Sequence, residues 1–257
     1  MSGEPLTVPS TTSADQRQRR ALVTRGGWDG HQPVEATELF IPFLREHGFD
    51  VRVEESPAVY AEADYMDGLD LVVQSITMST IEPDQLKGLV AAVAAGTGFA
   101  GWHGGIADSF RNSSDYLQLV GGQFATHAAL HPPHERKGEM EDNYVPHRVE
   151  LTEAGRQHPI TSGLDDFDLV TEQYWILSDD LNDVLATTTT DTRDWEPWHR
   201  PVTCPAVWTR SWGQGRVFVA TPGHRVDVLQ DPNVRTLVER GLLWAGRSLE
   251  TAQEETR

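Results

Sequence analysis

Three histidines each follow a strand-like segment at the point where the chain turns away from it. His31 comes after ALVTRGGWDG, His103 after GFAGW, and His224 after GRVFVATPG. Glu172 is a carboxylate within the otherwise apolar segment VTEQYW, and acids are rarely buried without a partner. Three imidazoles and one carboxylate suit Zn²⁺, or Mn²⁺ or another transition metal. We therefore expect a divalent metal site at the three histidines, with Glu172 as a further ligand or as a catalytic base.

The evidence for this site lies in the set of residues and not in any one of them. A lone loop histidine is structural more often than it is functional, and Glu172 alone would also suit a solvated strand position. No local metal signature such as H-E-x-x-H is present, so the ligands must converge in the fold. His127, in GGQFATH, is the second catalytic candidate, as ligand, acid/base or substrate contact.

Residues near the same strand ends are candidate substrate contacts. The tryptophans offer flat faces on which a sugar could stack, and core packing is the alternative for each of them. Asp108, one helical turn past His103, would either orient that imidazole or simply lie near a helix start, where acids are favoured. The predicted substrate-binding residues are Arg25, Trp28, Trp102, Asp108 and Trp175.

Several common active-site motifs are absent from the sequence. No G-x-S-x-G elbow provides a serine nucleophile. The glycines of TRGGWDG, after the first strand, lack the G-x-G-x-x-G spacing, and no G-x-x-x-x-G-K-[ST] pattern occurs, so we expect no nucleotide cofactor. The one cysteine, Cys204, lies at a strand start and not at a strand-to-helix bend, which favours a small buried residue over a nucleophile.

The first 105 residues alternate between strand-like and helix-like segments. Strands are predicted at 21–24, 49–56, 69–75 and 98–102, with helices beginning at Pro33 and Pro83 and ending near Gly48 and Gly96. This alternation predicts a doubly wound parallel sheet, in which ligands bind beyond the carboxyl ends of the strands. The segments 25–31 and 103–108 would therefore face the site.

The second half is richer in strands. We predict strands at 147–152, 168–178 and 184–190, a hairpin turning at 212–215, and a last helix over 233–246 capped by Asp231. The segment 122–147 contains three prolines and four histidines and shows little periodicity, so a long excursion near the site is expected there.

Composition limits the partners and the compartment. The chain has 257 residues and a formal net charge of −18, which disfavours nucleic acid and anionic membranes. A single cysteine fits a reducing compartment, and a cytoplasmic protein is expected. We expect a disordered leader at 1–20, one folded domain at 21–247 and a polar tail at 248–257. A homo-oligomer is permitted by the exposed-looking aromatic residues but is not required.

Six segments, in this order, resemble the ThuA-like family, named for trehalose utilisation: ALVTRGGWDGH, GFAGWHGG, GGQFATH, HPITSGL, VTEQYW and GRVFVATPGH. The resemblance implies a class I glutamine-amidotransferase-like fold, which is a flavodoxin-like three-layer α/β/α sandwich with a mainly parallel sheet. Relatives with amidotransferase activity carry a nucleophilic cysteine at the strand-to-helix bend, where this chain has Trp102 and His103. Some members look like metal-binding proteins, with histidines matching His31, His103 and His224.

The resemblance also implies a role in the catabolism of trehalose or a related disaccharide or glycoside. We expect a divalent-metal-dependent enzyme that takes a proton from a keto-sugar or keto-glycoside, leading to isomerisation or glycosidic cleavage, with Glu172 or His127 as the base. The small-molecule sugar is its expected partner. A non-catalytic sugar-binding or regulatory module is the alternative, and residual amidohydrolase or transferase chemistry is a weaker third hypothesis.

Overall fold

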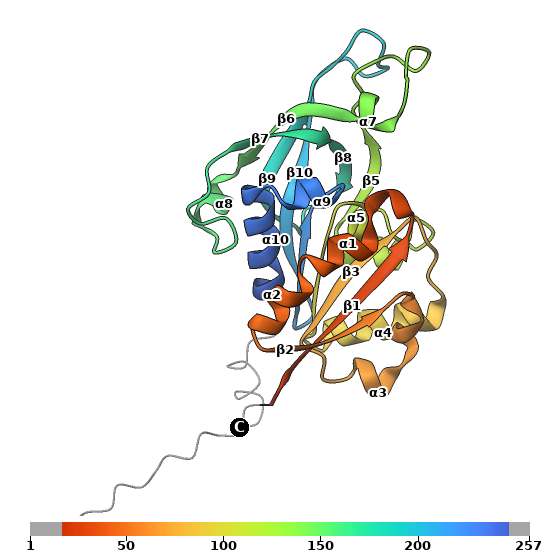
Figure 1. The fold of residues 1–257 in the computed structure, drawn as a ribbon, viewed down its shortest axis with the longest axis vertical. Helices are drawn as coiled ribbons and strands as arrows, with labels where there is room; N and C mark the ends of the chain where they lie inside the picture. The colour runs from red at the N-terminus through yellow and green to blue at the C-terminus, as the bar shows by residue number, and fades with distance from the viewer. Residues whose placement is uncertain (1–16, 247–257) are drawn as a thin grey trace, which may run out of the picture.

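The protein is described by a computed structural model that covers residues 17–246. A nine-stranded sheet forms its centre, in the order β2-β1-β3-β4-β11-β10-β9-β6-β7 (Figure 1). Neighbouring strands from β2 to β11 pair in parallel. These strands are β1 (Arg19–Gly27), β2 (Phe49–Glu54), β3 (Leu71–Thr77), β4 (Gly98–Trp102) and β11 (Gly215–Ala220). The predicted α/β fold with a mainly parallel core is confirmed.

The second half of the chain extends the sheet with antiparallel strands. They are β10 (Val202–Trp212), β9 (Asp183–Thr190), β6 (Tyr144–Leu151) and β7 (Phe167–Glu172). In Figure 1, β6 and β7 run across the upper ends of β9 and β10. A second, two-stranded sheet joins β5 (Gly122–His127) to β8 (Tyr174–Ser178).

Helices pack on both faces of the large sheet, which gives the three layers. One apolar cluster joins the sheet to α1 (Pro33–Glu38), α2 (Ile41–Glu46), α9 (Val226–Leu229) and α10 (Pro232–Ala245). The other cluster joins the opposite face to η2 (Pro57–Ala61), α3 (Ala63–Met66), α4 (Pro83–Ala94), α5 (Gly104–Ala107) and α6 (Ser114–Val120). The short segments η1 (Asp29–His31), α7 (Glu139–Asp142) and α8 (Glu153–Gln157) complete the helices of the described residues. The strand β3, whose seven residues are all buried, lies at the centre of this arrangement.

The helix predicted from Pro33 to His47 is wrong in one respect, because the chain forms two short helices there. The break falls at Leu39 and Phe40, and the second helix carries Pro42 in its first turn. Pro42 has no backbone N–H to donate to the preceding turn, so it ends one helix and begins the next. The apolar spacing survives the break, since Phe40 and Leu44 are both buried.

The segment 122–147 is more regular than its sequence indicates. Its first residues form β5, in which Phe124 pairs with Ile176 and His127 pairs with Tyr174, and its last residues begin β6. The antiparallel pairing with β8 supplies the hydrogen bonds that local periodicity could not predict. Residues 128–143 remain an excursion with the single short helix α7.

The residue predicted to cap the last helix is confirmed. Asp231 caps α10 by accepting hydrogen bonds from the backbone N–H of Asn233 and Val234. Strand β1 begins at Arg19, two residues inside the segment expected to be the leader. Residues 1–16 of that leader and the tail 248–257 lie outside the described residues. Within residues 17–246, none of the helices has the length and apolar character needed to cross a bilayer.

Candidate metal centre

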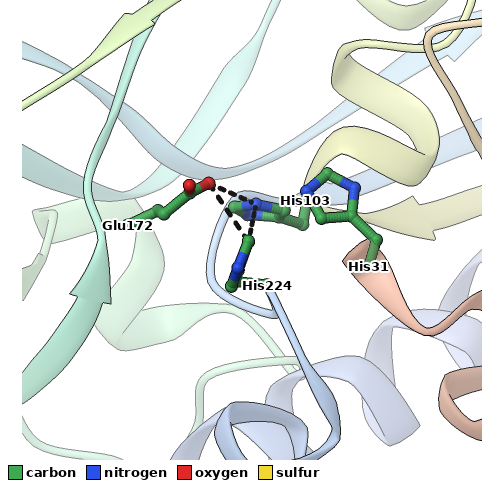
Figure 2. A group of neighbouring side chains, drawn as sticks. All are labelled: His31, His103, Glu172 and His224. Carbon is green, nitrogen blue, oxygen red and sulfur yellow. Dashed lines mark hydrogen bonds and ion pairs between the residues drawn. The ribbon is translucent and has the colours of Figure 1, made fainter. Parts of the chain in front are cut away.

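The structure brings the four predicted ligands together from distant parts of the chain. His31, His103, Glu172 and His224 each offer one ligand atom, and these atoms all lie within 4.8 Å of one another. Figure 2 shows the carboxylate of Glu172 and the imidazoles of His103 and His224 facing one another, with the ring of His31 beside His103. His31 ends η1 just past β1, and His103 lies between β4 and α5. Glu172 is the last residue of β7, and His224 follows β11.

His103 occupies a sharp bend between strand and helix. Its φ of 49° is unusual for a residue other than glycine, and such strained positions cluster at functional sites. A hydrogen bond of 2.7 Å from its backbone N–H to the Ala220 carbonyl joins the bend to the end of β11. A Cβ on Gly105 would lie 2.8 Å from Ser75 Cα, so only glycine lets α5 approach β3 this closely. The bend therefore projects His103 beyond the carboxyl ends of the parallel strands.

Hydrogen bonds fix which nitrogen of His103 and which of His31 faces the centre. Nδ1 of His103 lies 2.7 Å from the Thr221 carbonyl, which can only accept, so Nδ1 carries the proton. Its Nε2 lies 3.1 Å from Glu172 Oε2 and 3.2 Å from His224 Nδ1. Nδ1 of His31 contacts Thr77 Oγ1 at 2.8 Å, which leaves Nε2 as the ligand atom. Outer partners of this kind orient the histidines that bind metals in proteins.

Burial sets the charge state of the cluster. His31 is 8% exposed, Glu172 is 5% exposed, and His103 and His224 are each 1% exposed. Burial, reinforced by the neighbouring imidazoles, lowers the pKa of His31 to about 2. Burial also lowers the pKa of His103. For Glu172, burial alone would raise the pKa, but the imidazoles of His103 and His224 in contact with its carboxylate outweigh burial and hold the pKa below its usual range.

These charge states are the ones that bind a metal ion, namely neutral imidazoles and an ionised carboxylate. Three nitrogen donors and one oxygen donor form a set that Zn²⁺ and related ions accept. Without a cation, the acceptor atoms Nε2 of His103 and Oε2 of Glu172 would face each other at 3.1 Å inside the protein. The donor set therefore fits a divalent ion.

The second carboxylate oxygen of Glu172 faces a different pair of side chains. Oε1 lies 3.7 Å from His127 Nε2 and 3.5 Å from the amide nitrogen of Asn143. The same Asn143 nitrogen is 3.4 Å from His127 Nε2. Glu172 thus lies between the three histidines on one side and the pair His127 and Asn143 on the other.

Aromatic rings enclose the histidines. Tyr174 packs on His103 with 4.0 Å between ring centroids and 31° between ring planes. Tyr144 meets His224 edge to face, and Trp28 meets His31 in the same way with centroids 4.8 Å apart. Trp28 is 36% exposed, so it borders both the centre and solvent.

The other predicted substrate contacts lie away from the centre. Trp102 is 2% exposed and packs on Phe40 in the core, which is the alternative that the sequence left open. Arg25 pairs with Glu38 and Glu55.

Asp108 and Trp175 also have other neighbours. The carboxylate of Asp108 binds Arg111, so it does not orient His103, which is held by Thr221 instead. Trp175 meets Trp198 edge to face.

Sequence reasoning missed three residues of the site, namely Thr77, Asn143 and Tyr174. Thr77 ends β3 and pairs with Gly27 at the end of β1. Because the site lies beyond the carboxyl ends of these parallel strands, the position of Thr77 could have been used to predict that it is near the site. Tyr174 and Asn143 reach the site only through the pairing of β8 with β5 and the course of the 128–143 excursion, and nothing in the local sequence indicates either.

Solved structures with the same fold are distant in sequence. A ThuA-like protein from Bacteroides uniformis is 17% identical, with a TM-score of 0.64, over 93% of this chain and 95% of that one. One from Parabacteroides merdae is 15% identical, with a TM-score of 0.65, over 89% and 90%. A protein of Salmonella typhimurium described as cytoplasmic is 14% identical, with a TM-score of 0.58, over 89% and 100%.

No functionally curated protein matches this chain. The ThuA family model, described as trehalose utilisation, matches residues 20–245 and therefore spans all four residues of the metal centre. The resemblance found in the sequence is thereby confirmed, and the chain belongs to the ThuA family.

Proposed function

We propose that this protein is a divalent-metal-dependent enzyme that removes a proton from a keto-sugar or keto-glycoside. Membership of the ThuA family supports a carbohydrate-related function in general. The observation that carries the finer proposal is the convergence of three buried imidazoles and one buried carboxylate within 4.8 Å. We further propose that the protein works in the cytoplasm, as the Salmonella typhimurium protein is described.

In this proposal, His31, His103 and His224 hold the ion. When bound, a divalent ion supplies Lewis acidity that polarises a carbonyl oxygen of the substrate. The protein fixes where the ion would bind, because Thr77 holds the imidazole of His31 in place and the Thr221 carbonyl holds that of His103. The buried site also excludes water from the reacting atoms.

In the same proposal, the proton is transferred at Oε1 of Glu172, the carboxylate oxygen that faces His127. A keto group acidifies the neighbouring C–H bonds, and Oε1 of Glu172 or the adjacent His127 accepts the proton. Return of that proton to a neighbouring atom gives isomerisation, whereas departure of the glycosidic oxygen with a proton gives cleavage. Conventional glycosidases use a pair of carboxylates. Among the described residues, Glu172 is the one acid of this cluster, so we propose proton abstraction instead of the two-carboxylate mechanism.

Elemental analysis of the purified full-length protein tests the ligand set. We expect roughly one equivalent of metal in the wild type and a loss of most of it in His103→Ala, because one of three nitrogen donors is removed. His47→Ala is the matched control, since His47 is an exposed residue that caps α2. Equal metal content in wild type and His103→Ala would contradict the proposal.

Proton abstraction is tested by NMR in D₂O. The metal-loaded protein should exchange the hydrogen next to the carbonyl of 3-keto-trehalose for deuterium and should leave trehalose unchanged. Glu172→Gln should abolish this exchange, and its metal content then decides whether Glu172 is a base or also a ligand. Binding of both sugars without exchange would favour the non-catalytic sugar-binding module.

A further inference from the structure

A cavity of about 390 Å³ lies beside the metal centre. Two of its lining residues, His127 and Asn143, are the residues that approach Oε1 of Glu172. The cavity therefore adjoins the side of the carboxylate to which the proposed function assigns proton transfer. A substrate whose reacting carbon lay at Oε1 could place another part of itself there.

Two cationic residues, Arg136 and Lys137, are among those that line the cavity. The Nε of Arg136 donates a hydrogen bond of 3.3 Å to the His131 carbonyl. The chain as a whole carries a formal charge of −18, and Lys137 is one of its two lysines. A pair of cations on adjacent residues at a cavity beside a buried site is therefore unlike the average surface of this protein. Cationic side chains of this kind form strong, charge-assisted hydrogen bonds with carboxylates and phosphates.

The one acidic residue in the lining, Asp142, is already engaged within the protein. Its carboxylate accepts hydrogen bonds from the backbone N–H of Lys137 at 2.6 Å and of Gly138 at 2.7 Å, and it contacts His131 Nδ1 at 2.9 Å. These bonds, above all the one from the Gly138 N–H, hold the pKa of Asp142 below its usual range. Asp142 therefore shapes the loop that carries the two cations and does not neutralise them by direct pairing.

The imidazole of His127 has unused hydrogen-bonding capacity at the same place. Its Nδ1 is buried and finds no hydrogen-bond partner among the described residues. Buried polar atoms are rarely left in this state, and a bound ligand is one means of satisfying them. The cavity thus combines two cationic residues with a histidine that has one unsatisfied ring nitrogen.

We propose that this cavity binds an anionic group, a phosphate or a carboxylate, carried by the sugar whose reacting carbon lies at Glu172. The assignment rests on the proposed function, because it places the anionic group relative to that reaction site. Within the keto-sugars and keto-glycosides of the proposed function, it predicts a preference for those that also carry a phosphate or a carboxylate, so that uncharged 3-keto-trehalose binds more weakly than an anionic counterpart. Arg136 and Lys137 determine this specificity, and neither residue belongs to the metal-binding or proton-transfer set.

Calorimetry on the metal-loaded, full-length protein tests the assignment with four probes: glucose, glucose 6-phosphate, glucuronate and inorganic phosphate. At least one of the two anionic sugars should bind roughly tenfold more tightly than glucose. That preference should weaken as salt is raised from about 50 to about 200 mM, because the ion pairs are partly exposed. The better of the two identifies the anion as phosphate or carboxylate.

The double variant Arg136→Gln/Lys137→Gln should reduce the affinity for the anionic sugar to that for glucose. The matched control is Arg45→Gln/Lys87→Gln, which removes the same charge from two exposed positions and should retain the preference. An unchanged preference in the first variant would overturn the assignment. So would equal binding of glucose and both anionic sugars, or binding of inorganic phosphate as tight as that of the sugar phosphate.

Metal analysis of the same preparations separates this inference from the proposed function. A protein that prefers the anionic sugars but holds no metal would contradict the proposed function and leave the cavity assignment standing. A protein that holds metal but shows no preference for anionic sugars would overturn the cavity assignment alone.

Discussion

His31 is held in place by contacts that leave little room for change. Its Nδ1 contacts Thr77 on one side, and its ring lies against the first residue of α5. A Cβ on Gly104 would lie 2.5 Å from Cε1 and 2.9 Å from Nδ1 of His31. Glycine is thus required at position 104 for the imidazole of His31 to reach the centre. The reason is the lack of space for a Cβ and not an unusual φ angle.

We expect Gly104→Ala to lower metal affinity about tenfold or more, because the new methyl group displaces a ligand ring that outer contacts orient. The measurement is a competition titration with a zinc chelator. Gly138→Ala is the control, since nothing lies within 4 Å of its added Cβ. Wild-type affinity in Gly104→Ala would show that His31 is not a ligand or that its ring can move without cost.

At the scale of elements, the strand-to-helix bend at His103 is braced from beneath. Gln74 on β3 donates its amide to Ser109 Oγ and to the Tyr116 hydroxyl, and Tyr116 donates to the Ile106 carbonyl. These buried bonds join β3, α5 and α6 beneath the metal centre. A bend with unusual dihedral angles persists when the surrounding structure fixes it in this way.

The last helix depends on its first residue in a way that can be measured. The side chain of Asp231 accepts hydrogen bonds from two backbone N–H groups at the start of α10, at 2.9 and 3.2 Å. We expect Asp231→Ala to lower the free energy of unfolding by about 1 kcal/mol, since those donors lose their partner. Urea unfolding of the metal-free protein measures the loss.

Asp231→Asn is the matched variant, because asparagine is also a good cap, and it should retain most of the stability. If Ala and Asn at this position destabilised the protein equally, the cap would not be the source of the effect.

At the scale of the whole molecule, the two halves of the sheet meet at the metal centre. Glu172 belongs to β7, the terminal strand of the sheet, four positions from β11 in strand order. Its Oε2 is nevertheless 3.1 Å from Nδ1 of His224, which follows β11. The course of β6 and β7 across the neighbouring strands brings this about (Figure 1). The centre therefore exists only when both halves are folded together.

The half-buried His147 should make the metal-free protein sensitive to mild acid. Desolvation lowers the pKa of His147 below its ordinary value of 6.5, so the folded chain keeps this imidazole neutral while the unfolded chain takes up a proton. Stability is therefore full above about pH 6.5 and falls as the pH drops toward the lowered pKa, by at most about 1.4 kcal/mol per pH unit for one such group.

Urea unfolding with a chelator present, between about pH 7.5 and 5, measures this loss. His147→Gln should make the dependence on pH shallower. His134→Gln is the control: the His134 side chain is 78% exposed, so this change should leave the pH dependence of stability unaltered. A pH dependence unaltered by His147→Gln would exclude His147 as its source.

The sequence by itself indicated the first four parallel strands and named His31, His103, His224 and Glu172 as candidates for one centre. His31 and His103 follow strands that were predicted to be parallel, and parallel strands end at one edge of a sheet, so their meeting could be predicted from chain direction. The strand before His224 was predicted only as half of a hairpin, and the structure shows that it also pairs in parallel with β4.

Only the tertiary structure decided the rest. The approach of Glu172, the pairing of Tyr174 opposite His127, and the cavity between Asn143 and Lys137 all depend on antiparallel register and on the course of one long excursion. Such features are fixed by contacts between residues far apart in the chain. Local periodicity and spacing carry no record of those contacts.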